Sequence, residues 1–216
     1  MEKKSLEEII SELPHKNCGL CGARTCEEFA RLVGDGGSEM NRCIYLYSNK
    51  NESIQRGIKE TEIIWKDIHG RKFDFVLGKY SDDPGPRETI QPFNPANIEK
   101  LAIKKGDIVY GRPAAAGCPV THCGLVMEEP DYFNGTLIWC VVGPIYAREK
   151  GVYIGEYNPL AYEGVVCYSK KELKVGMRYF FLPAYCMLQS RHSGLINTIS
   201  RSEEGTKVYI EGIWIG

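Results

Sequence analysis

The stretch Asn17-Cys18-Gly19-Leu20-Cys21-Gly22-Ala23-Arg24-Thr25-Cys26, followed by Cys43, determines how the first part of the chain is expected to fold. Its cysteines have the spacing C-x2-C-x4-C-x16-C. Two cysteines three residues apart can place both sulfurs on one metal centre, and the glycine after each lets the backbone turn around it. Cys26 opens a predicted helix, whose positive end favours a thiolate. The spacing therefore predicts a four-thiolate site on Cys18, Cys21, Cys26 and Cys43.

Both zinc and iron–sulfur clusters accept four thiolates. Zinc sites more often show two C-x2-4-C pairs. One pair, one nearby third cysteine and one distant fourth favour a cluster, with zinc or four unrelated thiols as the alternatives. The glycines after the first two cysteines are expected to set the cluster potential through N–H···S bonds.

Two capping boxes predict short helices around this segment. Ser5 with Glu8 precedes an apolar period that Pro14 ends, and Thr25 with Glu28 precedes a second one that stops at Gly34.

From about residue 60 the apolar period changes to two, which is typical of strands. Strand-like runs occur at 107–112, 122–127, 136–142, 151–156, 163–168, 178–183 and 206–215. A hairpin is expected over 63–77, a loop at 81–86 and a short helix after Asn94. We therefore expect an α+β protein with two domains: a small helical iron–sulfur module over 1–50, and a larger, mainly antiparallel β domain, barrel or sandwich, over 60–216.

A second group of cysteines lies in the predicted β domain. Two readings are open: a second cluster, with His122 or His192 as an additional ligand or hydrogen-bond donor, or a redox dithiol formed by Cys118 and Cys123. Cys140 and Cys167 lie inside predicted strands, where a buried cysteine is also an ordinary core residue. The five candidates are Cys118, Cys123, Cys140, Cys167 and Cys186.

Two further stretches carry weaker signals. The tyrosines of 153–164 fit either a ligand pocket or docking face, or packing on a sheet surface. Arg191 fits either an anion contact or a loop cap.

Composition excludes several classes of protein. With 27 Lys+Arg against 28 Asp+Glu and no basic stripe, nothing predicts nucleic-acid binding. No apolar run is long enough for a membrane span and no signal-peptide core is present, so a cytoplasmic location is expected. Nine cysteines in such a chain are expected to serve metal, redox chemistry or the core rather than disulfides.

From Leu13 to Cys43 the chain resembles the four-cysteine [4Fe-4S] domain of corrinoid iron–sulfur protein large subunits and of the B subunit of Rnf-type complexes. The resemblance covers Leu13-Pro14, Asn17-Cys18-Gly19, Cys21-Gly22, Thr25-Cys26, Phe29-Ala30 and Cys43. It implies one [4Fe-4S] cluster on the four cysteines, one-electron transfer, and a corrinoid-type or other redox protein as partner. Ile44 departs from the proline usual in that family.

Three functions follow as hypotheses. The first is an electron-transfer protein of anaerobic metabolism, with one cluster and room for a second. The second is an enzyme, an iron–sulfur-dependent oxidoreductase that reduces a disulfide or another small substrate at Cys118 and Cys123. The third is a partner-binding protein in which the cluster only staples the N-terminal segment.

Overall fold

A computed structural model of the chain describes residues 4–15, 21–43, 46, 64–114, 118–142 and 151–215. Both predicted helix starts are confirmed. At α1 (Leu6–Glu12) the Ser5 hydroxyl accepts from the Glu8 N–H at 3.2 Å, and the Ser5 N–H donates to the Glu8 carboxylate at 2.7 Å. At α2 (Cys26–Gly34) the Thr25 hydroxyl accepts from the Glu28 N–H at 3.0 Å. A 3-10 turn, η1 (Met40–Arg42), follows.

Nine strands of the described residues form one sheet, and a short helix, α4 (Ala96–Lys100), follows the second of them. The strands are β1 (Phe75–Gly78), β2 (Arg87–Pro92), β3 (Ile108–Pro113), β4 (His122–Val126), β5 (Leu137–Val142), β6 (Val152–Ser169), β7 (Arg178–Pro183), β8 (His192–Ser202) and β9 (Gly205–Ile215).

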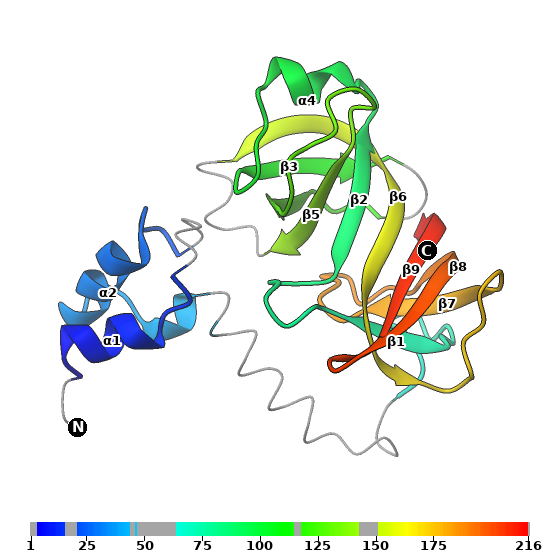
Figure 1. Cartoon of the computed structure of the whole chain (residues 1–216), viewed down its shortest axis with the longest axis horizontal. Helices are drawn as coiled ribbons and strands as arrows, with labels where there is room; N and C mark the ends of the chain where they lie inside the picture. The colour runs from blue at the N-terminus through cyan, green and yellow to red at the C-terminus, as the bar shows by residue number, and fades with distance from the viewer. Residues whose placement is uncertain are drawn as a thin grey trace.

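The long strand β6 organises this sheet. The order is β1-β7-β8-β9-β6-β2-β5-β4-β3, and β6 also pairs with β1 and β3, so the sheet closes on itself at both ends. In Figure 1, β6 runs from the part of the sheet next to α4 to the part that holds β1 and β7 to β9. The β1–β7 and β3–β6 pairs are parallel and the other pairs are antiparallel, so the sheet is mixed.

The predicted fold class, a small helical module followed by a separate β barrel or sandwich, was wrong. The described residues are dominated by one mixed sheet, and the N-terminal helices share their apolar core with it. Helices of seven and nine residues bury too little apolar surface to be stable alone. Their buried side chains join those of β3, β4 and β5 in one cluster, here called the N-terminal cluster: Ile9, Leu13, Ala23, Cys26, Phe29, Ala30, Cys43, Ile108, Cys123, Leu125 and Val142.

Several element predictions also differ from the structure. The two runs at 151–156 and 163–168 are one continuous strand, β6, and strands β2 and β8 were not predicted. In the described part of 63–77, the expected hairpin is reduced to a single bridge between Lys66 and Lys72, because β1 pairs with β6 and β7 instead. The predicted domain boundary, between 50 and 60, lies outside the described residues, and the division stays a prediction.

Candidate functional site

Three of the four predicted cluster ligands lie in the described residues and belong to one apolar environment. Cys26, the first residue of α2, and Cys43, just after η1, are 8% and 6% exposed and are members of the N-terminal cluster. Cys21 is half-buried and packs against the same cluster. Cys18 lies outside the described residues, so the complete four-thiolate set stays a prediction.

The surroundings of these thiols fit an iron–sulfur cluster. Gly22 has a φ of 94°, which lets the chain turn directly after Cys21. Thiolates are the usual ligands of such clusters, and apolar burial with backbone amides nearby tunes them. Within the described ranges, no three His, Cys, Asp or Glu side chains are grouped closely enough to hold a metal ion. The three described cysteines nevertheless share one apolar environment and offer the sulfur ligands that an iron–sulfur cluster needs.

Strand β4 lies between this thiol environment and a pocket. Successive side chains of a strand point to opposite faces. Cys123 is 1% exposed and belongs to the N-terminal cluster with Cys26 and Cys43. His122, its neighbour, points the other way and lines a pocket inside the sheet. The thiol environment and the pocket therefore lie on the two sides of one strand.

The pocket is a cavity of about 30 Å³ between strands that are distant in sequence. Its lining includes the two buried imidazoles of His122 and His192, the Tyr162 ring and the Cys186 thiol. Burial lowers the pKa of each of these two histidines to about 4, so both are neutral at pH 7.

A chain of polar contacts leads from the pocket wall into the core. The His122 ring lies 3.4 Å through Nε2 from the Cys118 sulfur, and its Nδ1 is hydrogen-bonded to the Tyr157 hydroxyl at 2.8 Å. Burial raises the pKa of the Cys118 thiol, so Cys118 is a thiol rather than a thiolate at pH 7.

A buried carboxyl group lies beside the pocket. Glu88 of β2 is fully buried, and its Oε2 accepts from Trp139 Nε1 at 2.8 Å. The Tyr162 hydroxyl also interacts with this carboxyl group. Its other oxygen, Oε1, has no hydrogen-bond partner in the described part of the chain. Burial raises the pKa of Glu88 to about 7, so a large share of this group is protonated at neutral pH.

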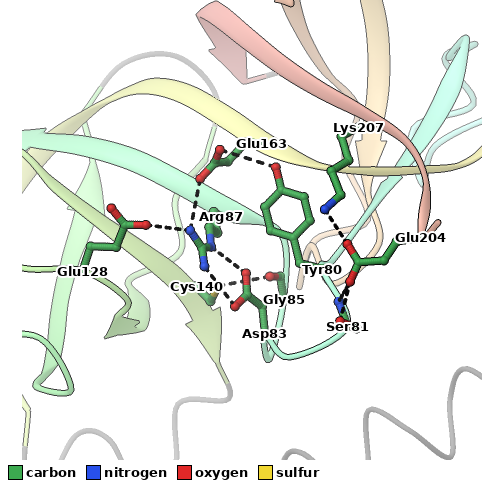
Figure 2. Close-up of polar contacts among 10 residues, drawn as sticks. All are labelled: Tyr80, Ser81, Asp83, Gly85, Arg87, Glu128, Cys140, Glu163, Glu204 and Lys207. Atoms are coloured by element: carbon green, nitrogen blue, oxygen red, sulfur yellow. Dashed lines mark hydrogen bonds and ion pairs between the residues drawn. The ribbon is translucent and has the colours of Figure 1, made fainter. Parts of the chain in front are cut away.

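Next to the sheet interior, Arg87 holds three carboxylates together, as Figure 2 shows. Its guanidinium contacts Asp83 at 2.6 Å, Glu128 at 2.8 Å and Glu163 at 3.6 Å. The Asp83 side chain is only 4% exposed, so this pairing offsets the cost of burying a charge. The network ties the loop before β2 to β6, a structural role.

The structure distributes the second cysteine group over several environments. Cys118 lies beside His122, whereas Cys123 projects to the opposite face of β4, so the proposed dithiol is not brought together. Cys140 is fully buried and donates to the Gly85 carbonyl at 3.0 Å, Cys167 is exposed, and Cys186 lines the pocket. The second cluster and the dithiol stay predictions without a described ligand set or pair.

Sequence reasoning missed Glu88 and did not single out Tyr157 or Tyr162. A lone glutamate in a period-two run is usually on a solvent face. The available signal was the density of tyrosines in 153–164, which the structure places in β6, with Tyr157 and Tyr162 buried and Tyr153 exposed. Arg191, the other weak signal, donates to the Lys72 carbonyl and stacks 3.8 Å from the centre of the Phe180 ring, as expected for a loop cap.

Comparison with known proteins identifies the class of the N-terminal segment. Residues 13–45 match the family model described as "Putative Fe-S cluster". A stretch of 47 residues, 22% of this chain, is 38% identical to the corrinoid/iron-sulfur protein large subunit of Moorella thermoacetica and covers 10% of that subunit. These matches confirm the predicted resemblance to corrinoid iron–sulfur protein large subunits. The chain is an iron–sulfur protein.

A second relative matches along almost the whole chain. "Uncharacterized protein MJ0119" of Methanocaldococcus jannaschii is 32% identical over 222 residues, which cover 96% of this chain and 92% of the relative. The chain belongs to the family of this archaeal protein. No solved structure matches this chain significantly. In the described residues, no helix is both long and apolar enough to cross a membrane.

Proposed function

We propose that the chain is an electron-transfer protein that holds one [4Fe-4S] cluster on Cys18, Cys21, Cys26 and Cys43. The observation that carries this proposal is the match of residues 13–45 to an iron–sulfur family model, together with the shared environment of the last three of these cysteines. Four thiolates would occupy every iron, which leaves one-electron transfer as the chemistry that such a cluster supplies.

The residues of the chain have distinct tasks in this proposal. Thr25 caps α2 and so fixes Cys26 as the first residue of that helix. The apolar side chains packed around Cys26 and Cys43, among them Phe29 at 1% exposure, keep water away from that side. Cys21 is only half-buried, so this ligand would lie nearer the surface than Cys26 and Cys43, where a partner could approach.

We propose a redox partner of the corrinoid-protein type and a role in anaerobic metabolism. The support is the match between this segment and the large subunit of a corrinoid/iron-sulfur protein.

Anaerobic purification followed by iron and sulfide analysis tests the proposal. We expect about four irons per chain and an electron paramagnetic resonance signal after reduction, both lost in Cys26→Ser and Cys43→Ser. The matched control is Cys167→Ser, since Cys167 is exposed and is not one of the four proposed ligands. Stoichiometric zinc, or iron retained in both ligand variants, would contradict the assignment. About eight irons would show a second cluster.

A further inference from the structure

The pocket behind β4 is a small cavity that neither the comparisons nor the proposed iron–sulfur cluster accounts for. It is lined mainly by apolar and aromatic groups, with a few polar atoms, as ligand sites usually are. A cavity of about 30 Å³ has room for roughly two waters, so an occupant has only a few non-hydrogen atoms.

The charge state of the lining selects against ions. His122 and His192 are neutral at pH 7, and no Lys, Arg, Asp or Glu of the described residues lines the cavity. Placing an unpaired charge in such surroundings costs far more than placing a neutral polar group there. The occupant is therefore uncharged.

The hydrogen-bonding groups indicate what the occupant offers. His192 is bonded through Nδ1 to the Ser190 carbonyl at 2.9 Å, which makes Nδ1 the protonated nitrogen. A neutral ring then has Nε2 as its acceptor. Tyr162, another lining residue, is hydrogen-bonded to the buried Glu88 carboxyl group, which is not itself part of the lining. The acceptor nitrogen of His192, which lines the cavity, favours an occupant that donates N–H or O–H.

We propose that this pocket binds a small uncharged molecule bearing an N–H or O–H donor, of the primary amide or alcohol class. The molecule would lie on the reverse side of the strand whose Cys123 belongs to the N-terminal cluster. Binding at the pocket does not depend on the proposed electron-transfer function.

Three probes of almost equal shape test this selectivity: acetamide, acetate and acetone. The full chain with its oxidised cluster, labelled with ¹⁵N, is titrated with each probe while the histidine side-chain resonances are followed. Acetamide should shift His122 and His192 in a saturable way, whereas acetate, which is charged, and acetone, which lacks a donor, should bind at least about tenfold more weakly. The exposed His15 and His69 serve as internal controls.

A matched pair of variants locates the binding. Val141→Phe fills the pocket and should abolish the saturable shifts, whereas Val175→Phe, at a position 58% exposed and outside the pocket lining, should retain them. Equal affinity for the three probes, no saturation in the wild type, or shifts of all four histidines together would overturn the proposal. If Val141→Phe does not fold, the wild-type titration decides alone. If the purified chain holds no iron but still shows the selective shifts, the proposed function fails and this inference stands.

Discussion

His122 and Cys123 are consecutive residues of β4, yet their side chains lie in different environments, the pocket and the N-terminal cluster. All five residues of β4 are buried, so the strand has a covered face on each side. Because successive side chains of a strand point to opposite faces, this one strand separates the pocket from the N-terminal cluster. Each of the following predictions tests a contact that holds this arrangement.

Replacing Tyr157 by Phe should remove the hydrogen bond that orients His122. We expect the free energy of unfolding to fall by about 1 to 2 kcal/mol, because a buried imidazole nitrogen loses its partner. Chemical denaturation measures this loss, and the ¹⁵N shifts of the His122 side chain should report a changed tautomer balance. Tyr153→Phe is the matched control, since Tyr153 is 55% exposed and should change neither quantity.

Glu88→Gln should change how stability depends on pH. Burial raises the folded-state pKa of Glu88 to about 7 from an ordinary value of 4.5, so the folded chain binds more protons between these values. The contribution of Glu88 is therefore complete below about pH 4.5 and is lost as pH rises towards 7. This loss amounts to about 3 kcal/mol.

The measurement compares wild type and Glu88→Gln by denaturant titration from pH 4 to pH 8. Relative to wild type, the variant should gain about 3 kcal/mol of unfolding free energy over this range. A constant difference between the two proteins would show that the carboxyl group titrates normally.

Arg87→Met should leave the buried Asp83 carboxylate without its main partner. We expect a loss of about 3 kcal/mol in unfolding free energy, because an unpaired buried charge is more costly than a buried pair. The double variant Asp83→Asn with Arg87→Met should recover part of this loss. Arg31→Met, which breaks an exposed pair with Glu27, should have no measurable effect. If Arg87→Met and Arg31→Met lost similar amounts of unfolding free energy, this would argue against the network shown in Figure 2.

Gly124→Ala should disturb the packing between β4 and β5. A Cβ placed at Gly124 would lie 2.3 Å from the Trp139 ring, so the indole that donates to Glu88 must move. Overpacking of this kind costs about 1 to 3 kcal/mol. Gly37→Ala is the control, since its nearest neighbour would be 3.5 Å away. Unchanged thermal stability and tryptophan fluorescence in Gly124→Ala would contradict this packing.

Local chemistry in the sequence was enough to predict the beginning of the chain. A hydroxyl followed three residues later by a glutamate completes a helix start without help from distant residues, and both predicted starts occur, at Ser5 and Thr25. The cysteine spacing likewise identified an iron–sulfur segment, which the comparisons confirm for residues 13–45.

Only the tertiary structure decided which apolar faces pack together. A period of two shows that side chains alternate, but it cannot say whether one face or both are covered, and β4 is covered on both. For the same reason the sequence did not show that the helices share a core with the sheet, or that Glu88 is buried beside Tyr162. The local spacing of the cysteines was thus enough to predict the thiol chemistry. The pocket, by contrast, exists only because β6 brings distant strands into contact.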